Sequence, residues 1–178
     1  MGGSTGSTGT NGFILTNGNP IVDVFHPAYD NSPTGPTLPD SNWVWDTIGG
    51  TVNAPITFEF DFDLTGFDPD SATLSGVWGV DNVATAFLNG NQIASLPNHL
   101  IANFNPMVPL DVGTGTGFFN SGINLLSFTA EDFGPPGAFR TAFRIDANEV
   151  NPVPLPAGAP LLILGLIGLG WLGRRRPV

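Results

Sequence analysis

The sequence predicts an all-β domain, built as an antiparallel sandwich and followed by one hydrophobic helix at the C-terminus. Three observations lead to this prediction. Glycine and proline are frequent, with 24 and 17 residues, so turns should be common and long helices rare. Between residues 20 and 148 short stretches alternate between apolar and polar residues, and helical periodicity is absent. An uncharged stretch then precedes three arginines near the end of the chain.

Residues 56–64 show the clearest strand pattern, because every even position is apolar and every odd position is polar. Asn89-Gly90 lies between two further strands and predicts a hairpin, since both residues tolerate positive φ. The other expected strands cover residues 21–25, 42–46, 72–80, 83–88, 91–95, a stretch near 108, 125–130 and 138–147. Short strands separated by turns predict a sandwich.

The chain divides into four segments by composition. We expect a flexible lead over residues 1–19, because residues 1–12 are rich in Gly, Ser and Thr and lack the basic and apolar regions of a secretory signal peptide. The sandwich is expected over 20–148, a proline-rich linker over 149–158, and a transmembrane or sorting helix with an arginine tail over 159–178.

The body of the protein is strongly acidic. The chain has no lysine, and only two of its five arginines, Arg140 and Arg144, precede the tail. Two arginines against fifteen acidic residues give the body a formal charge of −13. Such a surface repels nucleic acid and anionic lipid head groups, and it suits neutral ligands or cations. Cysteine is absent from the sequence, so disulfides and thiol chemistry are excluded.

The tail has the composition of a membrane segment. Residues 153–173 contain no charged side chain, and Arg174, Arg175 and Arg176 follow at once. A basic cap of this kind is typical of the cytoplasmic end, which places the body outside the membrane. A helix over residues 160–173 would span only about 21 Å, short of a hydrocarbon core of about 30 Å. We therefore expect contact with the membrane through residues 159–173 that ends on processing; the alternative is a buried core helix.

The tail also resembles a known sorting signal. The matching parts are Val153, Pro154, Leu155, Pro156 and Ala157, then the apolar helix, then the arginine cluster. Together they are similar to the VPLPA variant of the PEP-CTERM sorting domains. The resemblance implies a bacterial cell-envelope protein that is recognised by an exosortase-type sorting enzyme. After cleavage near the proline motif, the body would be attached at the cell surface or secreted.

The body resembles the galactose-binding-domain-like jelly rolls. The resemblance covers most of residues 20–148 and depends on the order of several short pieces. These pieces are residues 43–45, 58–66, 80–82, 87–90 and 122–128. It implies a jelly-roll sandwich and, more loosely, contact with carbohydrate.

Aromatic and amide side chains are the candidate ligand-binding residues. Trp43, Trp45 and Trp78 could form a platform on which sugar rings stack, and the alternative is that they fill the core. Asn82 and Asn89 could contact sugar hydroxyls from loops, and the alternative is that they supply turn geometry.

Five charged residues are expected to form structural ion pairs. Glu59, Asp61 and Asp63 make an acidic row on one face of a strand, at intervals of roughly 6.6 Å. Arg140 and Arg144 share one face of the last strand. Because three neighbouring carboxylates repel each other, we expect the two arginines to neutralise them.

A structural calcium ion is the other candidate neutraliser, because Ca²⁺ binds several oxygen ligands from loops. The candidate ligands are Asp23, Asp30, Asp68, Asp70 and Asp81, with Asn82 beside them. No EF-hand spacing is present. His26 and His99 stand apart and argue against a zinc site.

These observations favour a non-catalytic exported module that binds surface carbohydrate or exopolysaccharide. The first alternative is a structural surface or biofilm-matrix protein without a specific ligand. The second is a weak glycoside hydrolase, because the separation of a carboxylate pair cannot be read from sequence. The motif of a serine nucleophile elbow is not found in the sequence.

Overall fold

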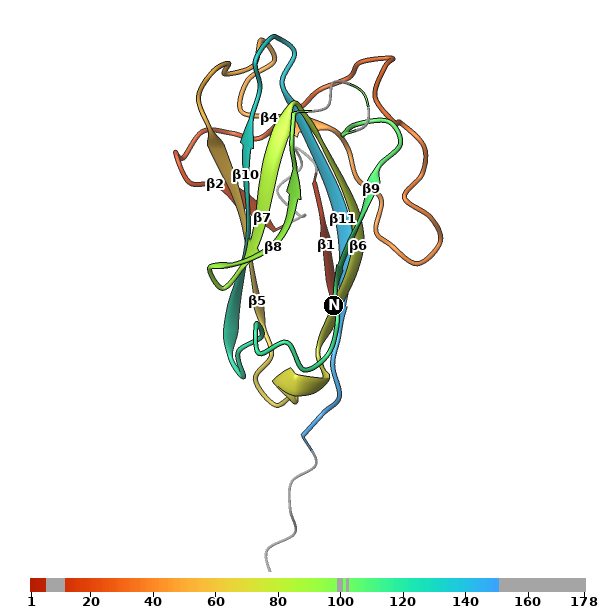
Figure 1. Ribbon diagram of the computed structural model, residues 1–178, viewed down its shortest axis with the longest axis vertical. Helices are drawn as coiled ribbons and strands as arrows, with labels where there is room; N and C mark the ends of the chain where they lie inside the picture. The colour runs from red at the N-terminus through yellow and green to blue at the C-terminus, as the bar shows by residue number, and fades with distance from the viewer. Residues whose placement is uncertain (6–11, 99–100, 102, 151–178) are drawn as a thin grey trace, which may run out of the picture.

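The computed structural model describes residues 1–5, 12–98, 101 and 103–150, which form two antiparallel sheets packed face to face (Figure 1). Among these residues no helix is long and apolar enough to cross a membrane. The expected helix over 159–173, the sorting motif and the arginine cap lie outside the described residues.

Each sheet is built around a central pair of long strands. Sheet A has the order β3 (Val22–Asp23), β4 (Val44–Trp45), β11 (Ala138–Asp146), β6 (Thr73–Asp81) and β9 (Val108–Val112), and β1 (Gly2–Ser4) also pairs with β11. Sheet B has the order β2 (Phe13–Leu15), β5 (Ile56–Asp63), β10 (Ile123–Glu131), β7 (Val83–Leu88) and β8 (Asn91–Leu96). A 3-10 helix, Pro69–Ser71, connects β5 to β6.

The strands from β4 to β11 pair as one long hairpin folded over itself. β4 pairs with β11, β5 with β10, β6 with β9, and β7 with β8, all antiparallel. This pairing of first with last is the order of a jelly roll. The predicted antiparallel sandwich is thus confirmed.

Alternation of apolar and polar residues correctly placed the main strands. In β5 the side chains of Phe58 and Phe62 are buried, whereas those of Asp61 and Asp63 are exposed. The expected hairpin is present between β7 and β8, with positive φ at Asn89 (51°) and Gly90 (80°). The stretch expected near residue 108 is β9.

The flexible lead predicted over residues 1–19 is wrong for two segments. β1 pairs with β11, and β2 pairs with β5, so both belong to the sandwich. Gly3 allows a close approach, because a Cβ there would lie 2.7 Å from the Phe60 ring and 2.8 Å from the Phe143 ring. A strand of small residues shows no apolar alternation, which is why the sequence pattern missed β1.

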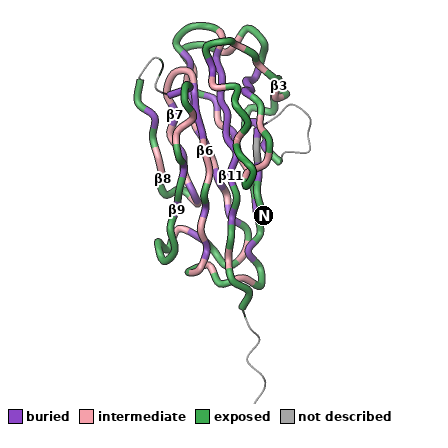
Figure 2. The backbone as a smooth tube through the Cα atoms, turned by 90° about the vertical axis from the view of Figure 1, so that its right-hand side faces the viewer, coloured by how far each residue is buried: buried purple, intermediate pink, exposed green. Residues whose placement is uncertain are grey.

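The core between the sheets is dominated by aromatic rings. Phe58 from sheet B stacks on Phe139 from sheet A, with 4.7 Å between ring centroids. Phe128 packs against Phe139 at 4.9 Å and against Trp78 at 5.8 Å. Buried residues follow the strands, and exposed residues gather in the loops at both ends (Figure 2). Aromatic pairs across the layers therefore hold the two sheets together.

The two ends of the sandwich differ in what they carry. The end where the described chain leaves also holds the 3-10 helix, since Asp68 N–H donates to the Asn148 carbonyl oxygen at 2.8 Å. We call this the tail end. The opposite end holds the β6–β7 and β10–β11 connections, and we call it the far end (Figure 1).

Candidate functional site

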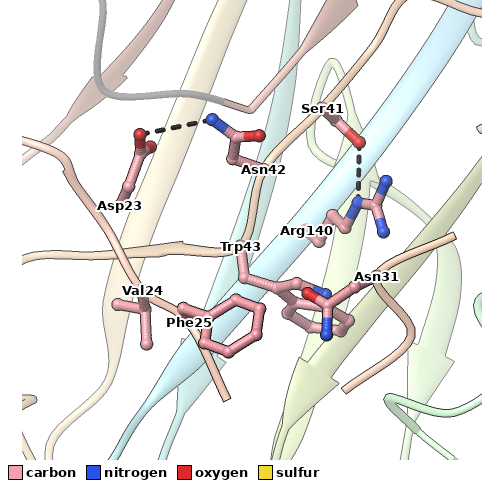
Figure 3. Close-up of a pocket in the computed structure, with 8 residues that line it drawn as sticks. All are labelled: Asp23, Val24, Phe25, Asn31, Ser41, Asn42, Trp43 and Arg140. Carbon is pink, nitrogen blue, oxygen red and sulfur yellow. Dashed lines mark hydrogen bonds between the residues drawn. The ribbon is translucent and has the colours of Figure 1, made fainter. Parts of the chain in front are cut away.

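A pocket of about 230 Å³ lies where the edge of sheet A meets the loop that follows β3 (Figure 3). We call it the Phe25 pocket. It combines residues from β3 and the loop after it, from the segment before β4, and from β11, where Arg140 is 99 residues after Ser41. Its lining consists of Asp23, Val24, Phe25, Asn31, Ser41, Asn42, Trp43 and Arg140.

Arg140 holds this region together from inside. Although its side chain is charged, Arg140 is only 4% exposed. Its Nε donates to Ser41 Oγ at 2.9 Å, and its guanidinium donates to the carbonyl oxygens of Asp30 and Ser32, the latter at 2.9 Å. Burial lowers the pKa of Arg140, and the nearby carboxylate charges of Asp30 and Asp40 oppose this. A buried guanidinium thus fastens the loop to β11.

Trp43 forms a buried wall of the pocket. Its indole Nε1 donates to the Asp30 carbonyl oxygen at 2.9 Å, and its ring packs on Tyr29 with 4.8 Å between centroids. Tyr29 packs in turn on Phe104 at 5.2 Å. This second, smaller aromatic cluster supports the loop from the side of sheet A.

Of the two interpretations of the tryptophans, core filling is confirmed and the sugar-stacking platform is wrong. Trp43, Trp45 and Trp78 are 2%, 0% and 1% exposed. Trp45 is packed so closely that a Cβ on Gly137 would lie 2.5 Å from its ring. Stacking on a ligand needs a free aromatic face, which these residues do not offer.

Phe25 is the exposed aromatic residue of the pocket, and sequence reasoning did not single it out. It is 78% exposed, although most phenylalanines of the body are buried or half-buried. It follows the two-residue strand β3, where the alternation is too short to distinguish an outward ring from a core residue. Because the exposed ring lies beside polar lining groups, it is the aromatic surface that a ligand in this pocket could contact.

The polar groups at the pocket present mainly hydrogen-bond acceptors. Asn42 Nδ2 donates to Asp23 Oδ2 at 3.2 Å. Asn31 Nδ2 donates to the carbonyl oxygens of Tyr29 and His26 at 2.9 and 3.1 Å. Because the amide nitrogens are engaged in this way, the Asn oxygens and the Asp23 carboxylate are the groups suited to accept bonds from a ligand.

A second pocket, of about 420 Å³, lies at the far end of the sandwich. It is lined by Asp81, Asn82, Asn98, Ile101, Phe104, Phe133 and Gly134. Burial raises the pKa of Asp81 to about 6; the bond from the Tyr29 hydroxyl opposes this shift, and the charge of Asp132 adds to it. The Tyr29 hydroxyl lies 3.1 Å from Asp81 Oδ2 and 2.6 Å from the Pro136 carbonyl oxygen.

Asp132 is a fully buried carboxylate near this second pocket. Its Oδ1 accepts from the Gly134 N–H at 3.0 Å, and its Oδ2 has no hydrogen-bond partner within the described part of the chain. Burial raises the pKa of Asp132. Both carboxyl groups at the far end are thus shifted toward their neutral forms.

The five candidate calcium ligands lie in separate places. Asp23 and Asp30 are near the Phe25 pocket, Asp68 and Asp70 form the turn at the tail end, and Asp81 is at the far end. Over the described ranges, no three acidic or histidine side chains come together as a metal-binding group. His99 lies outside those ranges.

The predicted ion pairs between the acidic row and the arginines are wrong. Glu59, Asp61 and Asp63 lie on β5 of sheet B, whereas Arg140 and Arg144 lie on β11 of sheet A. Both sets point outward, so the whole sandwich separates them. The partner of Arg144 is Asp146, at 2.7 Å. Asp63 accepts bonds from the Thr65 N–H and hydroxyl.

Of the two candidate asparagines, one supports a turn and the other borders a pocket. Asn89 Nδ2 donates to Phe118 O and Asn124 Oδ1, both at 2.8 Å, and its Oδ1 accepts from the Leu125 N–H at 2.9 Å. These bonds fix the β7–β8 turn, as the turn interpretation predicts. Asn82 lines the far-end pocket, and its Oδ1 accepts from the Phe133 N–H at 2.7 Å.

Replacing Arg140 should weaken the fold much more than replacing Arg144. The variant Arg140→Met leaves the Ser32 carbonyl oxygen and the Ser41 hydroxyl without the donor from Arg140, and it leaves the Asp30 carbonyl oxygen with the Trp43 indole alone. This should lower the free energy of unfolding by at least about 2 kcal/mol. Arg144→Met is the matched control, since Arg144 is exposed and pairs only at the surface. Urea unfolding of both variants tests this. Equal losses would show that the buried guanidinium does not hold the loop.

Stability should fall as pH rises from 5 to 7, and Asp81→Asn should reduce this fall. The folded-state pKa of Asp81 is raised from 3.8 to about 6, so its contribution is complete below pH 3.8 and lost as pH rises through about 6. A protonated Asp81 can donate to the Tyr29 oxygen, which leaves the Tyr29 proton for Pro136. Thermal unfolding at pH 5, 6 and 7 measures the slope.

The control for this pH dependence is Asp63→Asn, because hydrogen bonds from Thr65 lower the pKa of Asp63 and move its titration below that window. A wild-type slope retained in Asp81→Asn would contradict the assignment. Asp132, shifted in the same direction, should account for the slope that remains.

Comparison with known proteins adds distant structural likenesses. No protein-family model matches the chain, and no curated protein matches it. A family 35 carbohydrate-binding module from an environmental isolate is 19% identical, with 72% of this chain and 88% of that chain covered and a TM-score of 0.37. A CBM35 module from Cellvibrio japonicus Abf62 is 15% identical, with 85% and 100% covered and a TM-score of 0.38. CsCBM6-3 from Clostridium stercorarium, in complex with cellobiose, is 11% identical, with 74% and 95% covered and a TM-score of 0.33. At these TM-scores the likenesses do not assign a function to this chain.

Proposed function

We propose that this chain is an exported cell-envelope protein whose β-sandwich is a non-catalytic module that binds surface carbohydrate or exopolysaccharide at the Phe25 pocket. The observation that carries the proposal is the 78% exposed ring of Phe25 beside a pocket lined by Asp23, Asn31 and Asn42. Sheet A and the Arg140-bound loop hold these groups in place.

The chemistry of the pocket matches that of a sugar ring. A pyranose has an apolar C–H face, which can pack on the exposed Phe25 ring, and a rim of hydroxyl donors. The carboxylate of Asp23 and the amide oxygens of Asn31 and Asn42 are acceptors for such donors. A concave site with a few polar groups that fix orientation is typical of small-ligand recognition. The body charge of −13 also favours a neutral ligand over an anionic one.

The lining of the pocket favours binding over hydrolysis. A glycoside hydrolase uses two carboxyl groups, roughly 5–9.5 Å apart, on either side of the scissile bond. Of the residues that line the Phe25 pocket, only Asp23 is acidic. A non-catalytic module therefore fits better than a hydrolase.

Phe25→Ala should weaken glycan binding at least tenfold without changing the melting temperature. The ring is exposed, so its loss removes contact with the ligand but little packing. Ile48→Ala is the control, because Ile48 is 80% exposed and does not line the pocket. The full chain, in mild detergent, is assayed on a glycan array and then by titration calorimetry.

Three outcomes would count against the proposal. Unchanged affinity in Phe25→Ala would place binding elsewhere. Absence of binding to every glycan would favour a structural or matrix protein without a specific ligand. Turnover of a bound polysaccharide would favour the hydrolase.

We further infer that the tail directs sorting by an exosortase-type enzyme. The support is the order of Val153-Pro154-Leu155-Pro156-Ala157, an apolar stretch, and Arg174-Arg175-Arg176. The arginine cap favours an orientation with the body outside the cytoplasmic membrane. After processing, the sandwich would be attached at the surface or secreted.

Replacing Pro154 and Pro156 with Ala should block processing in cells that contain the sorting enzyme. The unprocessed form would then accumulate in the membrane and run at a higher mass on a gel. Pro177→Ala, beyond the arginine cap, is the matched control. Normal processing of the double variant would contradict recognition of the proline motif.

A further inference from the structure

The outer face of sheet B carries a row of hydroxyl groups that the Phe25 pocket does not use. Thr57 on β5 pairs in register with Thr129 on β10, which pairs with Thr85 on β7, which pairs with Ser95 on β8. The hydroxyls of Thr57 and Thr129 lie 3.1 Å apart. With strands about 4.8 Å apart, the row crosses roughly 14 Å of the sheet.

A second row, with three polar residues and one phenylalanine, runs beside the first. Glu59 pairs with Ser127, Ser127 with Phe87, and Phe87 with Gln92. These side chains are exposed or half-buried, and they share the outward parity of the first row. We call the two rows together the hydroxyl face. It spans β5, β10, β7 and β8, the left-hand layer in Figure 1.

The hydroxyl face is hollowed at one side. A pocket of about 480 Å³ there is lined by Thr85, Gln92, Ser95, Thr129 and Glu131, among others. The lining mixes hydroxyl, amide and carboxylate groups with six apolar residues: Pro55, Val83, Ala84, Leu96, Pro97 and Ala130. Such a groove can exchange many hydrogen bonds with a ligand that is itself rich in hydroxyls.

The charge of this face has one sign. Glu59 lies in the second row, Glu131 lies two residues beyond Thr129 on β10, and Asp61 and Asp63 continue the same side of β5. The sequence has no lysine, and the two arginines of the described residues are both on β11 of sheet A. A ligand on the hydroxyl face thus meets acidic groups and hydroxyls, so a positively charged, hydroxyl-rich polymer complements it.

We propose that the hydroxyl face binds a polysaccharide that carries free amino groups, such as a partly deacetylated amino-sugar polymer. The sugar hydroxyls would meet the row of Thr and Ser hydroxyls, and the ammonium groups would lie near Glu59 and Glu131. Uronic-acid and sulfated polymers would be repelled. This surface lies on the other sheet from the Phe25 pocket, so the proposal extends the proposed function and does not depend on that pocket.

The test compares two hexamers with the same backbone. The full chain in mild detergent is titrated with β-1,4-linked hexaglucosamine, which has free amines, and with its fully N-acetylated form. Binding of the free-amine hexamer should be at least tenfold tighter, and its affinity should fall as salt is raised. Equal affinity for the two hexamers would overturn the proposal.

Variants locate the binding on the face. Glu131→Gln and, separately, the double change Thr85→Val with Thr129→Val should each weaken binding of the free-amine hexamer at least fivefold. The matched control is Asp111→Asn on β9, an exposed acidic residue of sheet A, which should leave the affinity unchanged. An equal loss in Asp111→Asn would show diffuse charge attraction and would overturn the proposal.

Two further binding measurements distinguish this proposal from its alternatives. Phe25→Ala should keep its affinity for the free-amine hexamer; loss there would assign the binding to the Phe25 pocket instead and overturn this proposal. A lysine hexapeptide should bind at least tenfold more weakly than hexaglucosamine, because it lacks the hydroxyls. Equal binding of that peptide would show that the face recognises charge alone, which would also contradict the proposal.

Discussion

The Phe25 pocket depends on one buried cation. Arg140 is one of two arginines in a body with fifteen acidic residues, and it is placed under a loop, away from most of these carboxylates. Burying a guanidinium costs several kcal/mol unless hydrogen bonds replace its hydration. Here the bonds to Ser41 and to the carbonyl oxygens of Asp30 and Ser32 supply that replacement. The same bonds attach the loop that carries Asn31 to β11. The shape of the pocket and the burial of Arg140 therefore depend on the same hydrogen bonds.

Polar chemistry is divided between the two sheets. Sheet A carries both arginines of the described chain and, with its loops, the Phe25 pocket. Sheet B carries the acidic row and the hydroxyl face, without a basic residue. Between them the core of Phe58, Phe128 and Phe139 is made of aromatic contacts that need no charge. Function can therefore differ between the faces while one core supports both.

Local patterns predicted the strands well and the site poorly, and the reason is physical. Alternation in residues 56–64 reports which face of a strand is buried, so β5 and the hairpin at Asn89 were predictable. β1 was missed because its glycines have no side chain, which lets the strand pack closely but leaves no apolar alternation to detect. The predicted ion pairs are wrong because alternation with a period of two shows which residues share a face of a strand. It does not show which sheet the strand joins. Arg140 and Phe25 show the same limit: a charged residue is buried and an aromatic residue is exposed, each because of a loop whose path is set by tertiary contacts.

The central claim is that the loop bound by Arg140 forms the glycan-binding surface. The most direct measurement is a ¹H–¹⁵N chemical-shift titration of the labelled full chain in detergent micelles with a panel of neutral oligosaccharides. A ligand should produce saturable shifts at the amides of Asp23, Phe25, Asn31 and Asn42, with those of the tail-end residues Asp68 and Asp70 unmoved. Saturable shifts confined to other parts of the sandwich, or no saturable shift with any oligosaccharide, would contradict the claim.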